Sequence, residues 1–259
     1  TIGQDLVAMC VNDMVTSGAH PLFFLDYFAS SKLDVIETAS VIKGIAKACK
    51  KANCSLIGGE TAEMPNHYKG KKFDLAGFSV GVVEKKLIID SLKVRKNNII
   101  IGIESSGAHS NGYSLINKLI KKSKLSKSEN EKLIKLALKP THLYTNVILD
   151  LVKKVKVKSI ANITGGGLTE NIPRSIPNTL SSEIYLNQWK MPQFFATLQK
   201  LGKIQMSDML RIFNCGIGMT VIIEPKELDS TMKVLSKHKF KGYKIGKVVN
   251  KSSSVITFL

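Results

Sequence analysis

Two acidic positions near the start of the chain have the residue types that hold a cation. Asp13 follows Asn12 inside an otherwise apolar stretch, where a carboxylate is costly unless it is paired, exposed or bound to a cation. Glu60 and Thr61 follow a pair of glycines, which let the backbone approach a ligand closely. Carboxylate and hydroxyl oxygens are ligands that magnesium takes beside phosphates. These residues predict a metal–nucleotide site; an exposed helix position and an ordinary strand–turn loop remain the alternatives.

Two glycine-containing stretches further along have the composition of anion-binding loops. The stretch 105–112 (SSGAHSNG) precedes an expected helix, whose first N–H groups can receive an anion. Its histidine can donate to a phosphate or transfer a proton near neutral pH, unless it is simply a solvated residue at a capped helix start. A glycine triplet follows a later strand, and neither stretch matches a P-loop or Rossmann fingerprint. The candidate anion-binding residues are Ser106, Gly107, His109, Ser110, Asn111, Gly165, Gly166 and Gly167.

The charge of the chain raises nucleic acid as a partner, and its composition argues against it. The 38 basic and 20 acidic residues give a net charge of +18. Only three of the basic residues are arginine, the side chain best suited to bidentate recognition of bases and phosphates. Lysines on solvated helix faces explain the excess more simply, so we expect no nucleic-acid partner. A basic nucleic-acid-binding protein stays open as an alternative, and it predicts steeply salt-dependent binding.

Cysteine usage and hydropathy limit the setting of the protein. The four cysteines include no CxxC pair, which disfavours a disulfide framework or a zinc site and favours a reducing compartment, the cytoplasm. Cys215 has no adjacent general base and is expected to be buried and structural. No apolar run approaches the roughly 20 residues of a membrane-spanning helix, so no membrane association is expected.

Strands and helices without strict alternation must position these residues, which predicts two α+β domains. In the first, the stretch 58–65 is expected as a loop after a short strand, and Asp34 with Glu37 predicts a helix start. A polar stretch at 90–98 coincides with a shift from balanced to basic charge, giving domains 1–92 and 93–259. The expected helices are 5–17, 34–51, 113–122, 128–138, 142–155, 193–201, 206–212 and 225–237; the expected strands are 22–29, 55–58, 74–84, 99–103, 159–163, 216–223, 243–249 and 254–258.

Seven segments, in order along almost the whole chain, resemble the phosphoribosylformylglycinamidine cyclo-ligase family, also called aminoimidazole ribonucleotide synthetases. Some are generic to a wider superfamily of ATP-using enzymes, whereas GGETAEMP, SSGAHSNGYS and FNCGIGM together are specific. The matching segments are TIGQDLVAMCVND (1–13), PLFFLDY (21–27), KLDV (32–35), CSLIGGETAEMP (54–65), SSGAHSNGYSL (105–115), residues 164–167 with 170–174, and FNCGIGM (213–219).

The resemblance implies a fold, a reaction and an assembly. The fold is a two-domain α+β synthetase, with an N-domain sheet that forms a homodimer interface and a C-domain of mixed sheet and helices. The reaction is the ATP-dependent closure of formylglycinamidine ribonucleotide to aminoimidazole ribonucleotide in purine biosynthesis. ATP and Mg²⁺ are the implied cofactors, and a phosphoryl group on the formyl amide oxygen makes that oxygen a leaving group.

Family positions map onto residues of this chain. Asp13 and Glu60 match the acidic magnesium–nucleotide residues, supported by Asn12 and Thr61; with His109 they are the expected catalytic residues. The 106–111 loop and the glycine triplet match substrate-binding positions, and Asp5 and Asp26 are weaker candidates.

The resemblance also implies an upstream glycine-rich segment with an Asp-Gly-Val-Gly-Thr-Lys motif, which these 259 residues do not include. We therefore expect a shortened N-terminal domain.

Two further alternatives accompany this reading. One is a sister enzyme of the superfamily, such as a selenophosphate synthetase, a thiamine-phosphate kinase or the amidotransferase-coupled preceding enzyme. The other is an inactive truncated fragment that serves as a dimeric scaffold.

Overall fold

The computed structural model describes residues 1–259, which divide into two compact units. The first unit contains residues 1–88 and 143–149, and the second contains residues 89–142 and 150–259. The segment 143–149, which the sequence analysis placed in the second domain, thus groups with the first unit. The boundary after residue 92 stays a prediction. No helix combines the length and the apolar character needed to cross a membrane.

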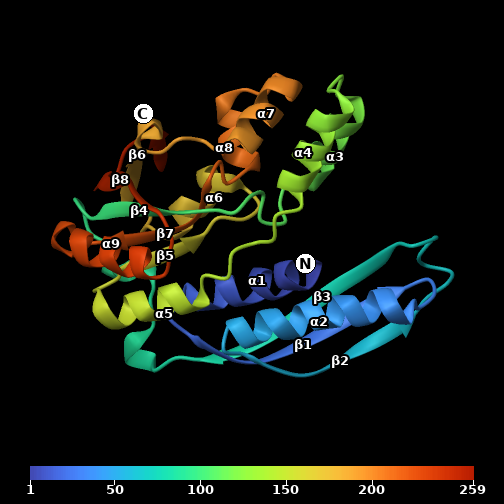
Figure 1. The fold of residues 1–259 in the computed structure, drawn as a ribbon. Helices are drawn as coiled ribbons and strands as arrows, with labels where there is room; N and C mark the ends of the chain where they lie inside the picture. Colours follow the sequence, from blue (N-terminus) through green and yellow to red (C-terminus); the bar gives the residue numbers. More distant parts are fainter. The chain divides into compact units, whose positions relative to one another are not determined.

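The first unit is a three-stranded sheet with two helices on one face. The strand β1 (His20–Ser30) is central, parallel to β2 (Ser55–Glu63) and antiparallel to β3 (Phe73–Val82). The helices α1 (Ile2–Val15) and α2 (Val35–Lys51) lie side by side across the sheet (Figure 1). Gly3 permits their close packing, because any side chain at this position would collide with the backbone of α2. Asp34 accepts hydrogen bonds from the first N–H groups of α2, which confirms the predicted helix start.

The predicted loop at 58–65 is wrong, because β2 continues through Glu63. Gly59 lies opposite Asp26 of β1, and a Cβ at Gly59 would collide with the Asp26 carboxylate. The glycine is therefore required for close approach between two strands rather than for a turn.

The second unit is built on a six-stranded sheet in the order β5-β7-β4-β8-β6-β9, antiparallel except for the pair β6–β9. The central strand β4 is buried on both faces: Ile100 belongs to the main core, and Ile101 lies beside Gly242 on the face that α9 covers. The strands are β4 (Ile99–Glu104), β5 (Ser159–Asn162), β6 (Leu180–Ile184), β7 (Ile217–Ile223), β8 (Gly242–Asn250) and β9 (Ile256–Phe258). The remaining helices are α3 (Tyr113–Lys122), α4 (Lys127–Ala137), α5 (Thr145–Lys154), α6 (Gly167–Arg174), α7 (Gln193–Gly202), α8 (Met206–Ile212) and α9 (Leu228–Lys237).

The predicted helices and strands are found within a few residues of their expected bounds, and the fold is the predicted two-domain α+β class. Among the α-helices and strands, α6 and β6 were not predicted. The helix α6 begins with glycine and contains Pro173, and β6 is a short LSSEI segment without apolar alternation. Both are stabilised by packing in the second unit rather than by local propensity.

Candidate functional site

The loop 105–112 joins β4 to α3 and is held from inside by its own histidine. His109 is almost fully buried, and it and Ser110 adopt left-handed backbone conformations, with φ of 50° and 59°. The ring atom His109 Nε2 lies 3.0 Å from the backbone nitrogen of Ser106 and 3.4 Å from that of His142. Ser106 Oγ lies 2.9 Å from the same atom and donates to the carbonyl of Pro140 at 2.6 Å.

These contacts decide the protonation of His109. A backbone N–H can only donate, so Nε2 must be an acceptor and the proton of the neutral ring resides on Nδ1. Burial, with a smaller contribution from the neighbouring His142, lowers the pKa of His109 to about 3. The ring is therefore neutral at physiological pH and engaged at Nε2 in holding the loop. This arrangement favours a positioning role; the catalytic role assigned from the sequence stays a prediction.

Asn214, in the turn before β7, fastens this loop to the sheet. Its side-chain Nδ2 donates to the carbonyl of Gly107 at 2.8 Å, and its Oδ1 accepts from Ser105 Oγ and from the Gly216 N–H, both at 2.9 Å. The side chain is buried, and every polar atom of its amide is used. Asn214 was not among the site residues predicted from the sequence. The segment FNCGIGM contained the only signal for it.

The glycine triplet forms the start of α6 beside the same turn. Gly166 and Gly167 have positive φ, and a Cβ at Gly167 would collide with the backbone carbonyls of Leu210 and Phe213. Gly165 has no such constraint, and a Cβ there would lie 3.5 Å from Asn111 Oδ1 of the first loop. The two predicted anion-binding loops are thus neighbours in the second unit.

Two helices begin at these loops, and neither has a side chain capping its N-terminus. The helix α3 follows Gly112, and α6 follows Gly166; both glycines are left-handed and offer no side-chain oxygen. Helix N-termini present N–H groups and the positive end of the helix dipole, which favours an anion such as a phosphate. This geometry can bind a phosphate ester with backbone donors.

The predicted nucleotide residues of α1 lie at one end of the first unit. Asn12 is buried, and its Oδ1 accepts the N–H of Tyr144 at 2.9 Å, so this amide anchors the 143–149 segment. Asp13, the next residue, lies near the beginning of β1. Its neighbour Met14 packs against Gly81, and Gly81 pairs with Pro21 near the start of that strand. The Asp13 side chain is exposed.

Glu60 lies on the other face of the sheet. A Cβ at Gly77 would contact the side chains of Phe24 and of Cys10 in α1, so position 77 faces the helices. Asp26 pairs with Gly77 on one side and with Gly59 on the other, so Asp26 and Gly59 point to the same helix-covered face. Glu60 is the next residue along β2 and points the opposite way. It also pairs with Tyr27, about 20 Å along β1 from Pro21 at the usual rise per residue.

The residues present do not fit a magnesium site shared by Asp13 and Glu60 within one chain. The two carboxylates lie on opposite faces of the sheet, and no group of three or more His, Cys, Asp or Glu side chains is arranged to hold a metal ion. Thr61 lines a pocket with Leu33, which precedes α2, and with Thr38 of α2; Asp13 is not among the residues that line it.

The structure gives the remaining candidate residues local structural roles. Asp26 is buried against Gly59, and burial raises the pKa of its carboxyl. Asp5 lies in the first turn of α1, where a carboxylate favours the helix dipole. Cys215 is buried as expected, and burial raises its pKa to about 12, so no thiolate forms near neutral pH.

Comparison with solved structures supports the fold. Thiamine-monophosphate kinase from Stenotrophomonas maltophilia superposes with a TM-score of 0.74 at 14% identity, covering 99% of this chain and 78% of that one. The E. coli hydrogenase maturation protein HypE gives 0.74 at 18% identity, covering 100% and 76%. HypE in complex with ATP gives 0.76 at 18% identity, covering 99% and 75%. At such identities the similarity concerns the fold alone.

Sequence comparison identifies the family. The AIR synthase related protein N-terminal domain matches residues 1–83, and the corresponding C-terminal domain matches residues 95–258. Phosphoribosylformylglycinamidine cyclo-ligase from Nitrosospira multiformis is 47% identical over 251 residues, which is 96% of this chain and 71% of the relative. The Paraburkholderia phymatum protein of the same name is 48% identical over the same shares. The chain therefore belongs to the phosphoribosylformylglycinamidine cyclo-ligase family of enzymes and contains both of its AIR synthase related domains in order.

Proposed function

We propose that the protein catalyses the ATP-dependent cyclisation of formylglycinamidine ribonucleotide to aminoimidazole ribonucleotide in purine biosynthesis. The observation that carries the proposal is a pair of uncapped helix starts, at Gly112 and Gly166, whose preceding residues Asn111 and Gly165 are neighbours. The relatives of this chain are named phosphoribosylformylglycinamidine cyclo-ligase. Backbone donors at these starts suit the 5′-phosphate of a ribonucleotide. The structural neighbour HypE, whose solved structure is a complex with ATP, supports nucleotide use by the same fold.

In the proposed reaction the γ-phosphoryl group of ATP is transferred to the formyl amide oxygen, and ADP is released. The amidine nitrogen then attacks the formyl carbon, forming a C–N bond. The C–O bond breaks, and its electron pair leaves with phosphate. The loops of the second unit would hold the ribose phosphate while His109 keeps the 105–112 loop in shape. Positioning of two anionic substrates is the main task of such a site.

The nucleotide is proposed to bind through the first unit, where the sequence assigns Asn12, Asp13, Glu60 and Thr61. Because Asp13 and Glu60 do not fit one shared ion in a single chain, no step is assigned to Mg²⁺. The carboxylates of Asp13 and Glu60 would each contribute to nucleotide binding separately.

The decisive experiment pairs two glycine-to-alanine variants. Gly165 has ordinary φ, and a Cβ there would make an ordinary van der Waals contact with Asn111 Oδ1 at 3.5 Å, so Gly165→Ala should fold normally and place a methyl group against a bound phosphate. We expect the KM for formylglycinamidine ribonucleotide to rise about tenfold or more, as expected when a close backbone contact is lost. The KM for ATP should be unchanged. Gly44→Ala in α2 is the matched control, because its Cβ would also make an ordinary van der Waals contact, with Gly3 Cα at 3.5 Å.

The chemistry is tested with a heavy-oxygen label in the formyl amide. The proposal requires that the label appears in released phosphate and that the product is lighter than the substrate by one water. Phosphate release without the amidine ribonucleotide, or a label retained in the product, would reject the cyclo-ligase reaction.

We also propose a homodimer formed through the uncovered face of the first unit's sheet. Phe78, Val80 and Val82 alternate with the helix-facing glycines of β3, and each is more than half exposed. Contiguous apolar surface of this kind marks an interface. Val80→Lys should shift sedimentation toward the monomer, whereas Val35→Lys at an exposed position of α2 should not; a monomeric parent protein would refute the dimer.

A cytoplasmic setting is proposed from the four free thiols.

A further inference from the structure

A buried amide lies beside the glycine triplet in the second turn of α6. It belongs to Asn171, which is 3% exposed. Its Nδ2 donates to the carbonyl oxygen of Gly165 at 3.0 Å and to that of Gly167 at 2.8 Å. Both hydrogens of the amide nitrogen are therefore used on the residues either side of Gly166.

Arg174 decides which way this amide points. Its Nη1 lies 3.1 Å from Asn171 Oδ1, and a guanidinium can only donate. The amide oxygen must therefore face Arg174, and the amide nitrogen must face the glycines. Only three of the 38 basic residues of the chain are arginine. Lysine, a point charge on a flexible stem, would orient a planar amide less firmly.

The carbonyl contacts fix the direction of two backbone N–H groups. The carbonyl of Gly165 faces Asn171, so in a planar trans peptide the N–H of Gly166 points the opposite way. The carbonyl of Thr164 accepts from the Gly167 N–H at 3.0 Å, so the N–H of Gly165 also points away from the start of α6. Neither of these two N–H groups donates a hydrogen bond within the protein. Successive N–H groups left open in this way form an anion-binding concavity.

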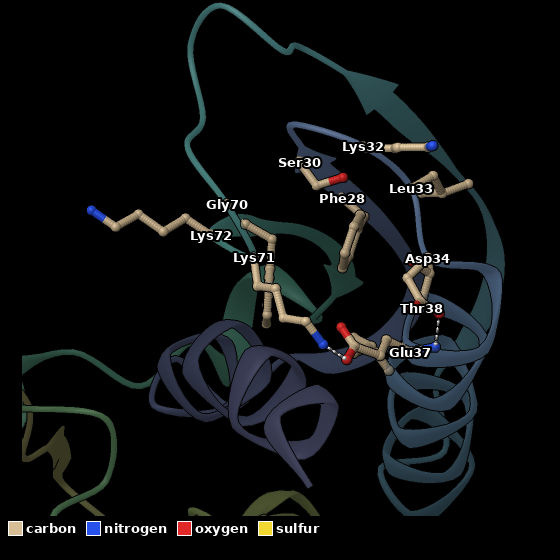
Figure 2. A pocket seen from close by; sticks show the side chains of 12 residues that line it. Phe28, Ser30, Lys32, Leu33, Asp34, Glu37, Thr38, Gly70, Lys71 and Lys72 are labelled. Atoms are coloured by element: carbon tan, nitrogen blue, oxygen red, sulfur yellow. Dashed lines mark hydrogen bonds and ion pairs between the residues drawn. The ribbon is translucent and has the colours of Figure 1, made fainter.

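The start of α2 in the first unit shows the contrasting arrangement. There the Asp34 carboxylate accepts the N–H groups of Ile36 and Glu37, each at 3.0 Å, and Glu37 is paired with Lys71 at 3.0 Å (Figure 2). A carboxylate of the protein thus occupies that helix start. At α6 the amide of Asn171 instead satisfies carbonyl groups and leaves the N–H groups open.

A second arginine offsets a carboxylate at the glycine turn. A Cβ at Gly166 would meet Glu170 Oε2 at 2.6 Å, so this carboxylate lies beside the turn. Arg211 Nε bonds to Glu170 Oε1 at 3.0 Å. A cation paired with the carboxylate reduces its repulsion of a phosphate. Arg211 therefore acts on the charge of the turn, and Asn171 acts on its shape.

We propose that Asn171 is a positioning residue for the phosphate of the ribonucleotide substrate. It holds the carbonyl groups of Gly165 and Gly167 toward α6, which leaves the N–H groups of Gly165 and Gly166 facing the phosphate. Arg174 keeps the amide in the required orientation, and Asn171 itself does not touch the ligand. The proposal rests on the proposed function for the identity of the ligand, and it adds the residue that gives the glycine turn its binding shape.

Nitrogen NMR of the whole, glycine-labelled protein tests the proposal, with ribose 5-phosphate as the probe and ribose as the uncharged control. The amide signals of Gly165 and Gly166 should shift with ribose 5-phosphate and not with ribose. Asn171→Leu keeps the approximate size of the side chain and removes its donor, so it should weaken the affinity read from these signals about three- to tenfold. Gly70, beside the lysines of the first unit's cavity, reports general attraction of the anion to lysine and should not respond (Figure 2).

Asn98→Leu is the matched control, because Asn98 is also buried and its Oδ1 accepts the Arg95 N–H at 2.8 Å. It precedes β4, at the opposite end of that strand from the loop 105–112. Both variants should lower the Tm, but only Asn171→Leu should weaken ribose 5-phosphate. Arg174→Met, at an exposed position, should weaken it less, and it keeps the test informative if Asn171→Leu does not fold.

The outcomes separate this proposal from the cyclo-ligase reaction. If Gly165 and Gly166 report the same affinity in the parent and in the variants at Asn171 and Arg174, the phosphate site remains and Asn171 does not position it. If neither signal responds in the parent, or if Gly70 responds instead, the turn binds no phosphate and the proposal is overturned together with the substrate site. If binding depends on Asn171 but no cyclisation is catalysed, the proposed function fails and the positioning role stands.

Discussion

Replacement of Asn214 by aspartate is a direct test of how the second unit holds the loop 105–112. The substitution preserves the shape of the side chain and its two accepted hydrogen bonds from Ser105 and Gly216. It replaces the amide nitrogen that donates to the Gly107 carbonyl at 2.8 Å with an oxygen that cannot donate when ionised. Two acceptors then face each other in a site that is 2% exposed.

The expected cost follows from these contacts. Loss of the hydrogen bond costs about 0.5–1.5 kcal/mol, and the unsatisfied Gly107 carbonyl adds about 1–3 kcal/mol. Together they predict a loss of about 2–4 kcal/mol in the free energy of unfolding, or a urea midpoint lower by about 1–2 M. Burial should raise the pKa of the new carboxyl above its unfolded value. Its protonated form can donate to Gly107, so the loss should be smallest at low pH and grow as pH rises through the raised pKa.

The assay is urea unfolding at several pH values, followed by a signal from the second unit. Asn146→Asp is the control, because Asn146 donates to the Lys51 carbonyl at the same 2.8 Å but in an exposed position. That variant should lose less than about 1 kcal/mol. If Asn214→Asp is as stable as the parent at every pH, Asn214 does not fasten the loop as described.

Three further outcomes follow from the structure. Because the pKa of His109 falls to about 3 on folding, this residue alone should cost the protein about 1.4 kcal/mol per pH unit below about pH 6.5. His109→Gln should reduce the slope of pH-dependent unfolding by that amount, and an unchanged slope would show that His109 does not contribute to it. Gly167→Ala should cost about 2–5 kcal/mol in thermal or urea unfolding, because φ is +56° and the new Cβ meets backbone; near-parent stability would contradict this packing. In a double-mutant cycle on kcat/KM, Asp13→Asn and Glu60→Gln should be additive within about 0.5 kcal/mol, and a larger coupling would indicate one shared ion.

Much of the secondary structure was predictable from local signals. The Asp34 cap, the helix at 113–122 and the apolar strand at 99–103 are each specified by residues within a few positions of one another. The continuation of β2 through GGETAE was not predictable, because glycines and charges resemble a loop until β1 supplies the paired strand. The helix α6 was missed for a similar reason, since its glycine start is stabilised by the turn after α8.

The sequence by itself determined the family, the two-domain class and the positions of the two glycine-containing loops at 105–112 and 164–167, because motifs and hydrophobic periodicity are local properties of the chain. Tertiary structure decided which side chains meet. It joined Asn214 to the 105–112 loop across more than 100 residues, and it neutralised His109 by burial. It also separated Asp13 from Glu60, because strand alternation assigns a side chain to a face only after the register with β1 is set.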